Sequence, residues 1–420
     1  MTKRKILISG GLAGGGIKTI VKNVLQLLAR EDAEVTVLSL QSHWTPEDFR
    51  DVEGSGARFV YPKSPLLKLP HGAKIEAILT WPLRLRRDFD VLYCIGHSKV
   101  HAPLRKFLGP GGLSIYHEVV EAPHPDVRDG SAKIRDIMVH DGIVATSRDI
   151  AERMRPFFPA KPMTVIPSLL EHVPAPVNRR PGPVSADGKL NVAYLSRIAK
   201  QKFPHWLVAR WKEWTERPGP LQGARLNLYA STKANETKDS ALVLDQILRT
   251  IQKDDLAGQV ILHRTEFRGE DRMEKLRAVF AESDLIALPS FYEGLPLSLV
   301  EAMLHGVPIV ALASGGIAEL GDDNPDAEIA DFLLSDGHDP NFARFEAALF
   351  RIAERIQSGE NDPQRLHKWT NERYGYEVAR ARWVRAFFET DEFLAALRNE
   401  PVRQASKSGD ESSAAAASVS

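Results

Sequence analysis

The chain of 420 residues is poor in cysteine and has no excess of charge of either sign. Cys94 is the only cysteine, which excludes an intramolecular disulfide and a zinc site built from cysteines. Basic and acidic residues number 55 each, and a net charge of zero argues against nucleic acid as a partner. Cys94 falls in the apolar run Val91–Ile95, which predicts a buried residue and fits a reducing, cytoplasmic compartment.

Long hydrophobic runs are also missing. No stretch approaches the roughly 18 apolar residues of a membrane span. The apolar part of the N-terminal sequence MTKRKILISG is too short for a signal peptide core and is better predicted as a first strand. We therefore expect a cytoplasmic protein whose only membrane contact would be at its surface.

The sequence contains enough apolar residues, 43%, for two folded domains. Strand-like and helix-like segments alternate, which predicts an α/β fold with parallel sheets covered on both faces. The predicted strands lie near residues 5–9, 35–40, 91–95, 113–117, 142–145 and 164–166, and then near 190–195, 226–229, 260–263, 285–289 and 308–312.

A segment rich in proline and glycine divides the chain at EHVPAPVNRRPGPVSADGK, residues 171–189. This composition disfavours regular structure and marks a linker between two similar domains that face one another across a cleft. We predict a first domain at 1–170, the linker at 171–189 and a second domain at 190–375. Residues 376–400 are predicted as a helix with a large apolar face, and 404–420 as a disordered tail.

The most informative stretch is SFYEGLPLSLVEAMLHGVPIVALASGGIAEL, which begins at Ser290. A predicted strand ends before Glu293, and Pro296 suits the first turn of a helix that carries Glu301. Free N–H groups near Leu295, Pro296, Leu297 and Ser298 are able to face an anion at this edge of a parallel sheet. Each carboxylate alone is compatible with an ordinary solvated residue. Their order with the Gly315-Gly316 turn favours a binding site.

Two cations follow the first strand of the second domain, in VAYLSRIAKQKFP. Arg197 and Lys202 leave the same strand-to-helix connection, where positive charge neutralises a diphosphate. In the first domain, His117 ends a predicted strand on the side of the cleft and is a candidate catalytic residue. Glu118 beside it is a rival, and a structural role for His117 is the ordinary alternative.

A glycine-rich loop, SGGLAGGGIKT, follows the first strand. Glycines such as Gly14, Gly15 and Gly16 allow close approach of a ligand to the backbone at a helix start. The loop is not a P-loop, because Ile17 separates Gly16 from Lys18, and it does not match the G-x-G-x-x-G fingerprint.

Residues 61–110 are basic, with aliphatic and aromatic residues interleaved in 63–87. Two interpretations stay open. The segment is either a positively charged face over an ordinary core or a peripheral contact with an anionic inner membrane.

Together these motifs resemble the retaining GT-B glycosyltransferases of glycosyltransferase family 4, over roughly residues 4–395. The family's E-x7-E motif matches Glu293 and Glu301 in EGLPLSLVE, and its glycine turn matches residues 315–317. Its Arg and Lys pair matches Arg197 and Lys202, and its N-domain glycine loop matches residues 14–16. The chain departs from the family pattern at Ser196, Ala318 and Ser168-Leu169, and none of these departures touches the carboxylates or the cations.

The resemblance implies two Rossmann-like domains and a UDP- or GDP-sugar donor, with a glycan or lipid-linked acceptor and no required metal ion or other cofactor. Glu301 would bind the ribose hydroxyls, and Glu293 and His117 would contact the donor sugar. Arg197 and Lys202 would stabilise the departing diphosphate. The helix around Trp383 would return to the first domain.

Three functions follow as hypotheses. The first is a retaining glycosyltransferase in the synthesis of cell-surface polysaccharide or glycolipid. The second is a nucleotide-sugar binding protein without turnover, and the third is a dinucleotide-dependent oxidoreductase suggested by the glycine loop.

Overall fold

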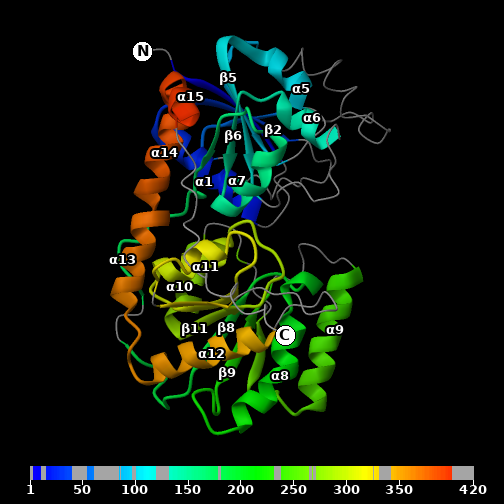
Figure 1. Cartoon of the computed structure of the whole chain (residues 1–420), viewed down its shortest axis with the longest axis vertical. Coiled ribbons are helices and arrows are strands. Elements are labelled where there is room, and N and C mark those ends of the chain that lie inside the picture. Colours follow the sequence, from blue (N-terminus) through cyan, green and yellow to red (C-terminus); the bar gives the residue numbers. More distant parts are fainter. Residues whose placement is uncertain are drawn as a thin grey trace, which may run out of the picture.

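The computed structural model describes residues 3–10, 16–39, 54–60, 85, 87–96, 101–119, 132–177, 181–230, 238–263, 267, 271–324, 326–330 and 342–399. These residues form two α/β lobes, one above the other in Figure 1, each built on its own sheet. The predicted tail at 404–420, most of the basic segment 63–87 and Gly15 of the glycine loop lie outside the described residues.

The sheet of the first lobe has seven strands in the order β3-β2-β1-β4-β5-β6-β7, and every neighbouring pair is parallel. The strands are β1 (Lys5–Gly10), β2 (Glu34–Ser39), β3 (Arg58–Val60), β4 (Phe89–Ile95), β5 (Leu108–Glu118), β6 (Gly142–Ala145) and β7 (Met163–Val165).

The sheet of the second lobe has six parallel strands in the order β10-β9-β8-β11-β12-β13. The strands are β8 (Asn191–Leu195), β9 (Arg225–Tyr229), β10 (Val260–His263), β11 (Leu285–Leu288), β12 (Ile309–Leu312) and β13 (Ala327–Ala330). The predicted α/β class with two parallel sheets is therefore confirmed.

Helices connect and cover the strands. They are α1 (Gly16–Arg30), α5 (His101–Leu104), α6 (Ala132–Met138), α7 (Arg148–Met154), α8 (Pro204–Glu216), α9 (Lys238–Lys253), α10 (Arg272–Glu282), α11 (Leu297–Leu304), α12 (Phe342–Gln357), α13 (Pro363–Tyr374), α14 (Tyr376–Phe388) and α15 (Thr390–Asn399). Short 3-10 helices are η2 (Arg105–Phe107), η3 (Arg155–Phe157), η4 (Lys200–Lys202) and η5 (Ala318–Leu320).

Both faces of the first sheet are buried, as the alternation along β1 shows. Ile6 and Ile8 join a cluster with α1 and α14, whereas Leu7 points to the opposite face and joins a cluster with α6 and α7. Successive residues of a strand face opposite sides, so each face needs its own layer of helices. Cys94 is buried in the second of these clusters, as predicted.

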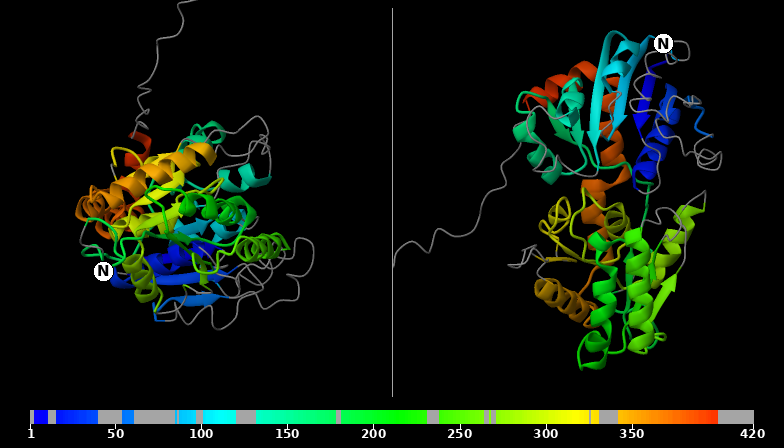
Figure 2. Two further views of the ribbon diagram at one scale, coloured as in Figure 1. Left: turned by 90° about the horizontal axis from the view of Figure 1, so that it is seen from below. Right: turned by 90° about the vertical axis from the view of Figure 1, so that its right-hand side faces the viewer.

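The last helices of the chain return to the first lobe. Figure 1 shows α13 and α14 running along one side of the molecule from the lower lobe to the upper one, with α15 at the top, and the right-hand view of Figure 2 shows the same path. Trp383 on α14 is fully buried against the first sheet and donates its ring N–H to the carbonyl of Pro167 at 3.2 Å. The C-terminal segment is therefore part of the first lobe's core.

Two edge strands, β3 and β13, are additions to the predicted set. Both are short, at three and four residues, and neither has the apolar run that marks the central strands. They are recognised as strands because each pairs with a neighbouring strand, and their local sequence pattern does not identify them.

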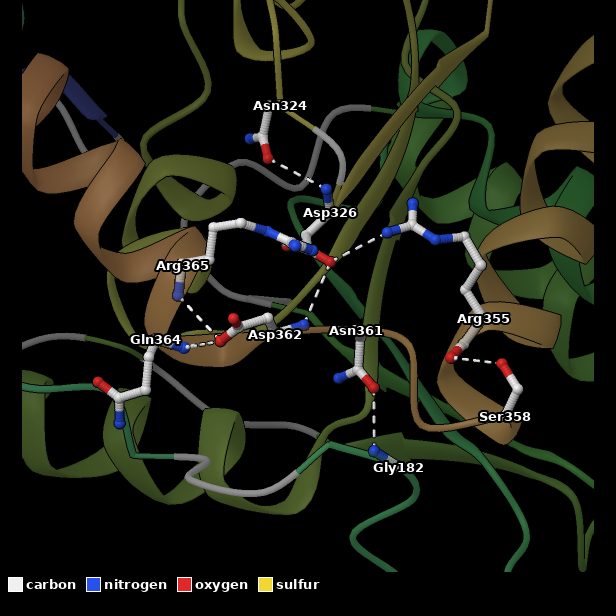
Figure 3. Close-up of polar contacts among 9 residues, drawn as sticks. All are labelled: Gly182, Asn324, Asp326, Arg355, Ser358, Asn361, Asp362, Gln364 and Arg365. Carbon is white, nitrogen blue, oxygen red and sulfur yellow. Dashed lines mark hydrogen bonds and ion pairs between the residues drawn. The ribbon is translucent and has the colours of Figure 1, made fainter.

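An ion network holds β13 against α12 and α13 (Figure 3). Asp326, just before β13, is fully buried and accepts hydrogen bonds from Arg355 at 3.2 Å and Arg365 at 2.8 Å. Asn361 accepts a hydrogen bond from the backbone N–H of Gly182 at 2.9 Å, so the same region also fixes the segment before β8. The edge of the second sheet is thus tied to both following helices.

A search of the described helices finds none that is both long and apolar enough to cross a bilayer.

Candidate functional site

The carboxyl edge of the second sheet carries the loop between β11 and α11. Glu293 in this loop forms a parallel bridge with Gly315, and its carbonyl accepts the N–H of Gly316 at 2.9 Å. A Cβ on Gly315 would lie 2.1 Å from the Glu293 carbonyl oxygen, and one on Gly316 would lie 1.8 Å from the Gly294 oxygen. The glycine turn is therefore required for this backbone to approach the loop so closely.

Lys202 reaches the same loop from η4, which follows β8. Its ammonium forms an ion pair with Oε1 of Glu293, and the two side chains are only 8% and 15% exposed. The N–H of Phe291 donates to the carbonyl of Gln201 at 2.7 Å, which joins the two loops through their backbones as well. Two predicted site residues, Lys202 and Glu293, are thus brought into contact.

The turn after Lys202 is locally strained. Phe203 has a φ of 50°, in the left-handed region that a residue with a large side chain seldom adopts. It directly precedes α8, whose first residue is Pro204. This turn fixes the direction in which η4 presents Lys202 to Glu293, and strain of this kind persists where surrounding structure holds it.

Arg197 lies at the same sheet edge but is exposed. Its carbonyl accepts a hydrogen bond from the Tyr194 hydroxyl at 2.8 Å, which anchors the backbone and leaves the guanidinium toward solvent. Burial raises the pKa of Tyr194, Glu293 raises it further and Arg197 lowers it. Arg197 and Glu293 therefore both lie within electrostatic range of one tyrosine.

Glu301 is buried on α11, with 4% of the residue exposed. It accepts a hydrogen bond from Nη2 of Arg272, the first residue of α10, at 2.6 Å. Sequence reasoning missed Arg272, because it begins a helix and does not follow the end of a strand as Lys202 and Glu293 do. One local signal was present. A cation at a helix N-terminus opposes the helix dipole, so its position calls for a partner elsewhere.

The start of α11 is apolar and packed. Leu295 and Pro296 are buried, and Pro296 is the residue that caps the helix. Leu297 packs against the core of the second lobe and against the cluster that contains α1 and α14. The helix start thus lies where the two lobes meet.

His117 occupies a sealed position at the carboxyl end of β5. It is fully buried, its Nδ1 lies 2.5 Å from the Tyr93 hydroxyl and its Nε2 lies 3.2 Å from Oγ1 of Thr146. Its ring also packs against Trp383. Burial lowers the pKa of His117 to about 3, so the ring is neutral at physiological pH. The contact with a donor sugar stays a prediction, and it requires this side chain to become accessible.

Of the glycine loop, only the end is described. Gly16 is the first residue of α1, and Gly15 lies outside the described residues. Glu118, the rival of His117, is buried and accepts a hydrogen bond from the Tyr116 hydroxyl at 2.6 Å.

The first lobe touches the second beside the glycine turn. Arg148, the first residue of α7, donates from its backbone N–H and from Nε to Oε2 of Glu319, both at 3.0 Å. It also pairs with Asp322, and the Tyr292 hydroxyl donates to Asp149 at 3.4 Å. These contacts, which the sequence did not indicate, hold the two lobes together next to Glu293.

One group of potential metal ligands occurs among the described residues, in the core of the first lobe. Atoms of Cys94, His101 and His140 lie within 4.8 Å of one another, and all three residues are buried. His140 makes hydrogen bonds with Ser114 at 2.7 Å and with His101 at 3.1 Å. These bonds account for both ring nitrogens of His140, so the group is explained as a buried polar network.

Known proteins resemble part of this chain in sequence. Residues 189–351 match the family model described as Glycosyl transferases group 1. D-inositol 3-phosphate glycosyltransferase from Corynebacterium jeikeium (strain K411) is 37% identical over 184 residues, which cover 43% of this chain and 40% of that protein. The chain spans less than half of the length of the curated relatives that it matches.

Solved structures resemble the whole described fold. Sucrose-phosphate synthase from Thermosynechococcus elongatus aligns with a TM-score of 0.67 at 16% identity, over 93% of this chain and all of that chain. HepE from Anabaena, in complex with UDP and glucose, aligns with a TM-score of 0.64 at 15% identity, over 94% of this chain and all of that chain.

Two parallel-sheet lobes joined by returning C-terminal helices define the GT-B fold, which is confirmed. Within it, residues 189–351 match the Glycosyl transferases group 1 model, and the resemblance to family 4 glycosyltransferases is confirmed as well.

Proposed function

We propose that the protein is a retaining glycosyltransferase that moves a sugar from a UDP- or GDP-sugar to a glycan or lipid-linked acceptor. One observation carries the proposal. Lys202 and Glu293 form a nearly buried ion pair beside the Gly315-Gly316 turn, inside the group 1 domain. A cation and a carboxylate taken out of water at a sheet edge are what a site for a charged sugar donor requires.

The roles of the residues follow from charge. Lys202 and Arg197 would neutralise the diphosphate, whose negative charge grows as the bond to the sugar breaks. Glu293 would contact the donor sugar, and its pairing with Lys202 makes it a weak nucleophile, which fits a binding role. Glu301 would bind the ribose, and the apolar start of α11 at residues 295–297 would lie along the nucleotide. No residue in this scheme needs a metal ion.

Support for the donor class comes from the relatives. The HepE structure holds UDP and glucose, and the curated relatives include glycosyltransferases and sucrose synthases. The proposed setting is cell-surface polysaccharide or glycolipid synthesis at the cytoplasmic face of a membrane, with peripheral contact through residues 63–87.

A transfer assay tests the proposal. Purified protein is incubated with UDP-, GDP- and ADP-sugars, with and without a panel of glycan and lipid acceptors, and release of the nucleoside diphosphate is measured. We expect turnover that falls at least about 100-fold in Lys202→Ala and in Glu293→Gln, because each removes charge stabilisation from the transition state. The exposed neighbour Lys200→Ala is the matched control and should keep wild-type turnover.

Two results would contradict the proposal. Wild-type rates in both site variants would remove Lys202 and Glu293 from the reaction. Calorimetric binding of a donor with no product from any acceptor would favour the nucleotide-sugar binding protein without turnover. The oxidoreductase hypothesis gains no support from the fold or from the relatives.

A further inference from the structure

A second pair of buried charges joins α10 to α11, the helix that follows the loop of Glu293. Arg272 and Glu301 are joined at 2.6 Å, with only 14% and 6% of their side chains exposed. Removal of either partner would leave a single charge in surroundings with little water, which is strongly unfavourable. The pair is therefore a fixed part of the site.

Glu171 interacts electrostatically with both members of the Arg272–Glu301 pair. Burial raises the pKa of Glu171, in the segment between the lobes, while Arg272 and Lys22 lower it and Glu301 raises it. Burial disfavours the charged form of Arg272, but Glu301 and then Glu171 outweigh this effect, and the pKa of the guanidinium is raised. One arginine thus compensates two carboxylates, and Lys22 on α1 of the first lobe adds positive charge nearby.

The position of Arg272 in its own helix is electrostatically unfavourable. As the first residue of α10 it places a cation at the positive end of a helix. A residue that breaks a local preference without a local gain is expected where function requires it. The gain here is long-range, because the guanidinium donates to Oε1 of Glu301 and orients the carboxylate.

We propose that Arg272 is a positioning residue that holds Glu301 ready to accept hydrogen bonds from the ribose hydroxyls of a nucleoside diphosphate. The inference rests on the proposed function, because it assumes a nucleotide donor. It adds a selectivity for ribonucleotides that depends on Arg272. A carboxylate fixed in this way binds a nucleotide with ribose hydroxyls more tightly than a nucleotide without them.

Nucleotide binding tests the proposal with two ligands and three proteins. Calorimetry measures the Kd of UDP and of 2′,3′-dideoxy-UDP, and of the GDP pair, for wild type, Arg272→Gln and Arg277→Gln. Arg277 is an exposed arginine on the same helix and gives the matched control. The ratio of the two Kd values isolates the ribose hydroxyls, because a general loss of structure weakens both ligands alike.

We expect wild type and Arg277→Gln to favour the ribonucleotide by about 10- to 100-fold, the range for hydrogen bonds to a charged group. In Arg272→Gln this preference should fall below about 3-fold, with the dideoxy ligand bound as in wild type. Arg272→Lys keeps the charge but not the planar guanidinium, and should give an intermediate preference. It also serves as the test variant if Arg272→Gln does not fold.

If the preference for the ribonucleotide in Arg272→Gln equals the wild-type value, the positioning role is overturned and the proposed function stands. Arg272→Lys gives the same test where Arg272→Gln does not fold. Wild-type protein that binds neither UDP nor GDP would instead overturn the proposed function. The two failures are therefore distinguishable in one set of titrations.

Discussion

At the scale of single residues, the site depends on contacts that connect distant parts of the chain. The sequence placed Lys202, Glu293 and the Gly315-Gly316 turn at one sheet edge, because each follows a strand of a parallel sheet. The structure joins them by an ion pair and a backbone bridge. Arg272 could not be found in this way, since its partner is known only once α10 and α11 are packed.

His117 shows the limit of reasoning from position along a strand. The end of a parallel strand is where ligands bind, and this favoured a catalytic role. Whether such a side chain is open to a ligand depends on what covers it, and here Trp383 from the far end of the chain packs against the ring. No pattern near residue 117 contains that information.

Burial of His117 predicts a loss of stability in acid. Its folded pKa of about 3 lies below the unfolded value, so the neutral ring stabilises the fold above pH 6.5, and this stability is lost as pH falls toward 3. Between pH 7 and pH 5 this group should lower the free energy of unfolding by about 2 kcal/mol. Urea unfolding at the two pH values should show a smaller difference for His117→Gln than for wild type. An equal difference would contradict this, and exposed His172→Gln is the control.

At the scale of elements, the central strands and two edge strands, β7 and β10, were predictable, whereas the edge strands β3 and β13 were not. Long apolar runs such as Val91–Ile95 identify strands buried on both faces. The edge strands β3 and β13 have only three and four residues, which is too short for a recognisable apolar run. Their existence follows from pairing, which a single sequence does not reveal. The predicted domain boundaries rest on composition and stay predictions.

The network around Asp326 predicts that burial sets the cost of losing an ion pair at the edge of the second sheet. Asp326→Asn leaves Arg355 and Arg365 facing a neutral group at a fully buried position, and we expect a loss of about 3–5 kcal/mol in the free energy of unfolding. Glu328→Gln, on the same edge strand, removes a more exposed pair with Arg351 and should cost less than about 1 kcal/mol. Chemical denaturation of both variants measures the difference, and similar losses would show that burial does not set the cost.

At the scale of the whole molecule, the C-terminal helices make the two lobes one unit. Trp383, Phe387 and Phe393 complete a core that includes residues of β1, β4, β5 and α1. The apolar residues of this segment were visible in the sequence. Their destination was implied only by resemblance, since an apolar face does not specify which surface it covers.

Loss of Trp383 should therefore destabilise the lobe that is farthest from it in sequence. We expect Trp383→Ala to lower the free energy of unfolding by about 3–5 kcal/mol through the cavity it leaves. Hydrogen exchange should localise the lost protection to β1, β4 and β5, more than to the second sheet. Protection lost first in β8 and β9 would contradict this assignment. Arg385→Ala, an exposed change on the same helix, is the control.

The return of α14 and α15 also has a consequence for biosynthesis. Residues 1–170 leave the ribosome long before Trp383, so the part of their sheet that α1 does not cover stays exposed while more than two hundred further residues are made. Domains in general fold as they emerge. Here α14 and α15 complete the core of a lobe that was translated much earlier, so we expect that lobe to be exposed to chaperones and to aggregation during the interval.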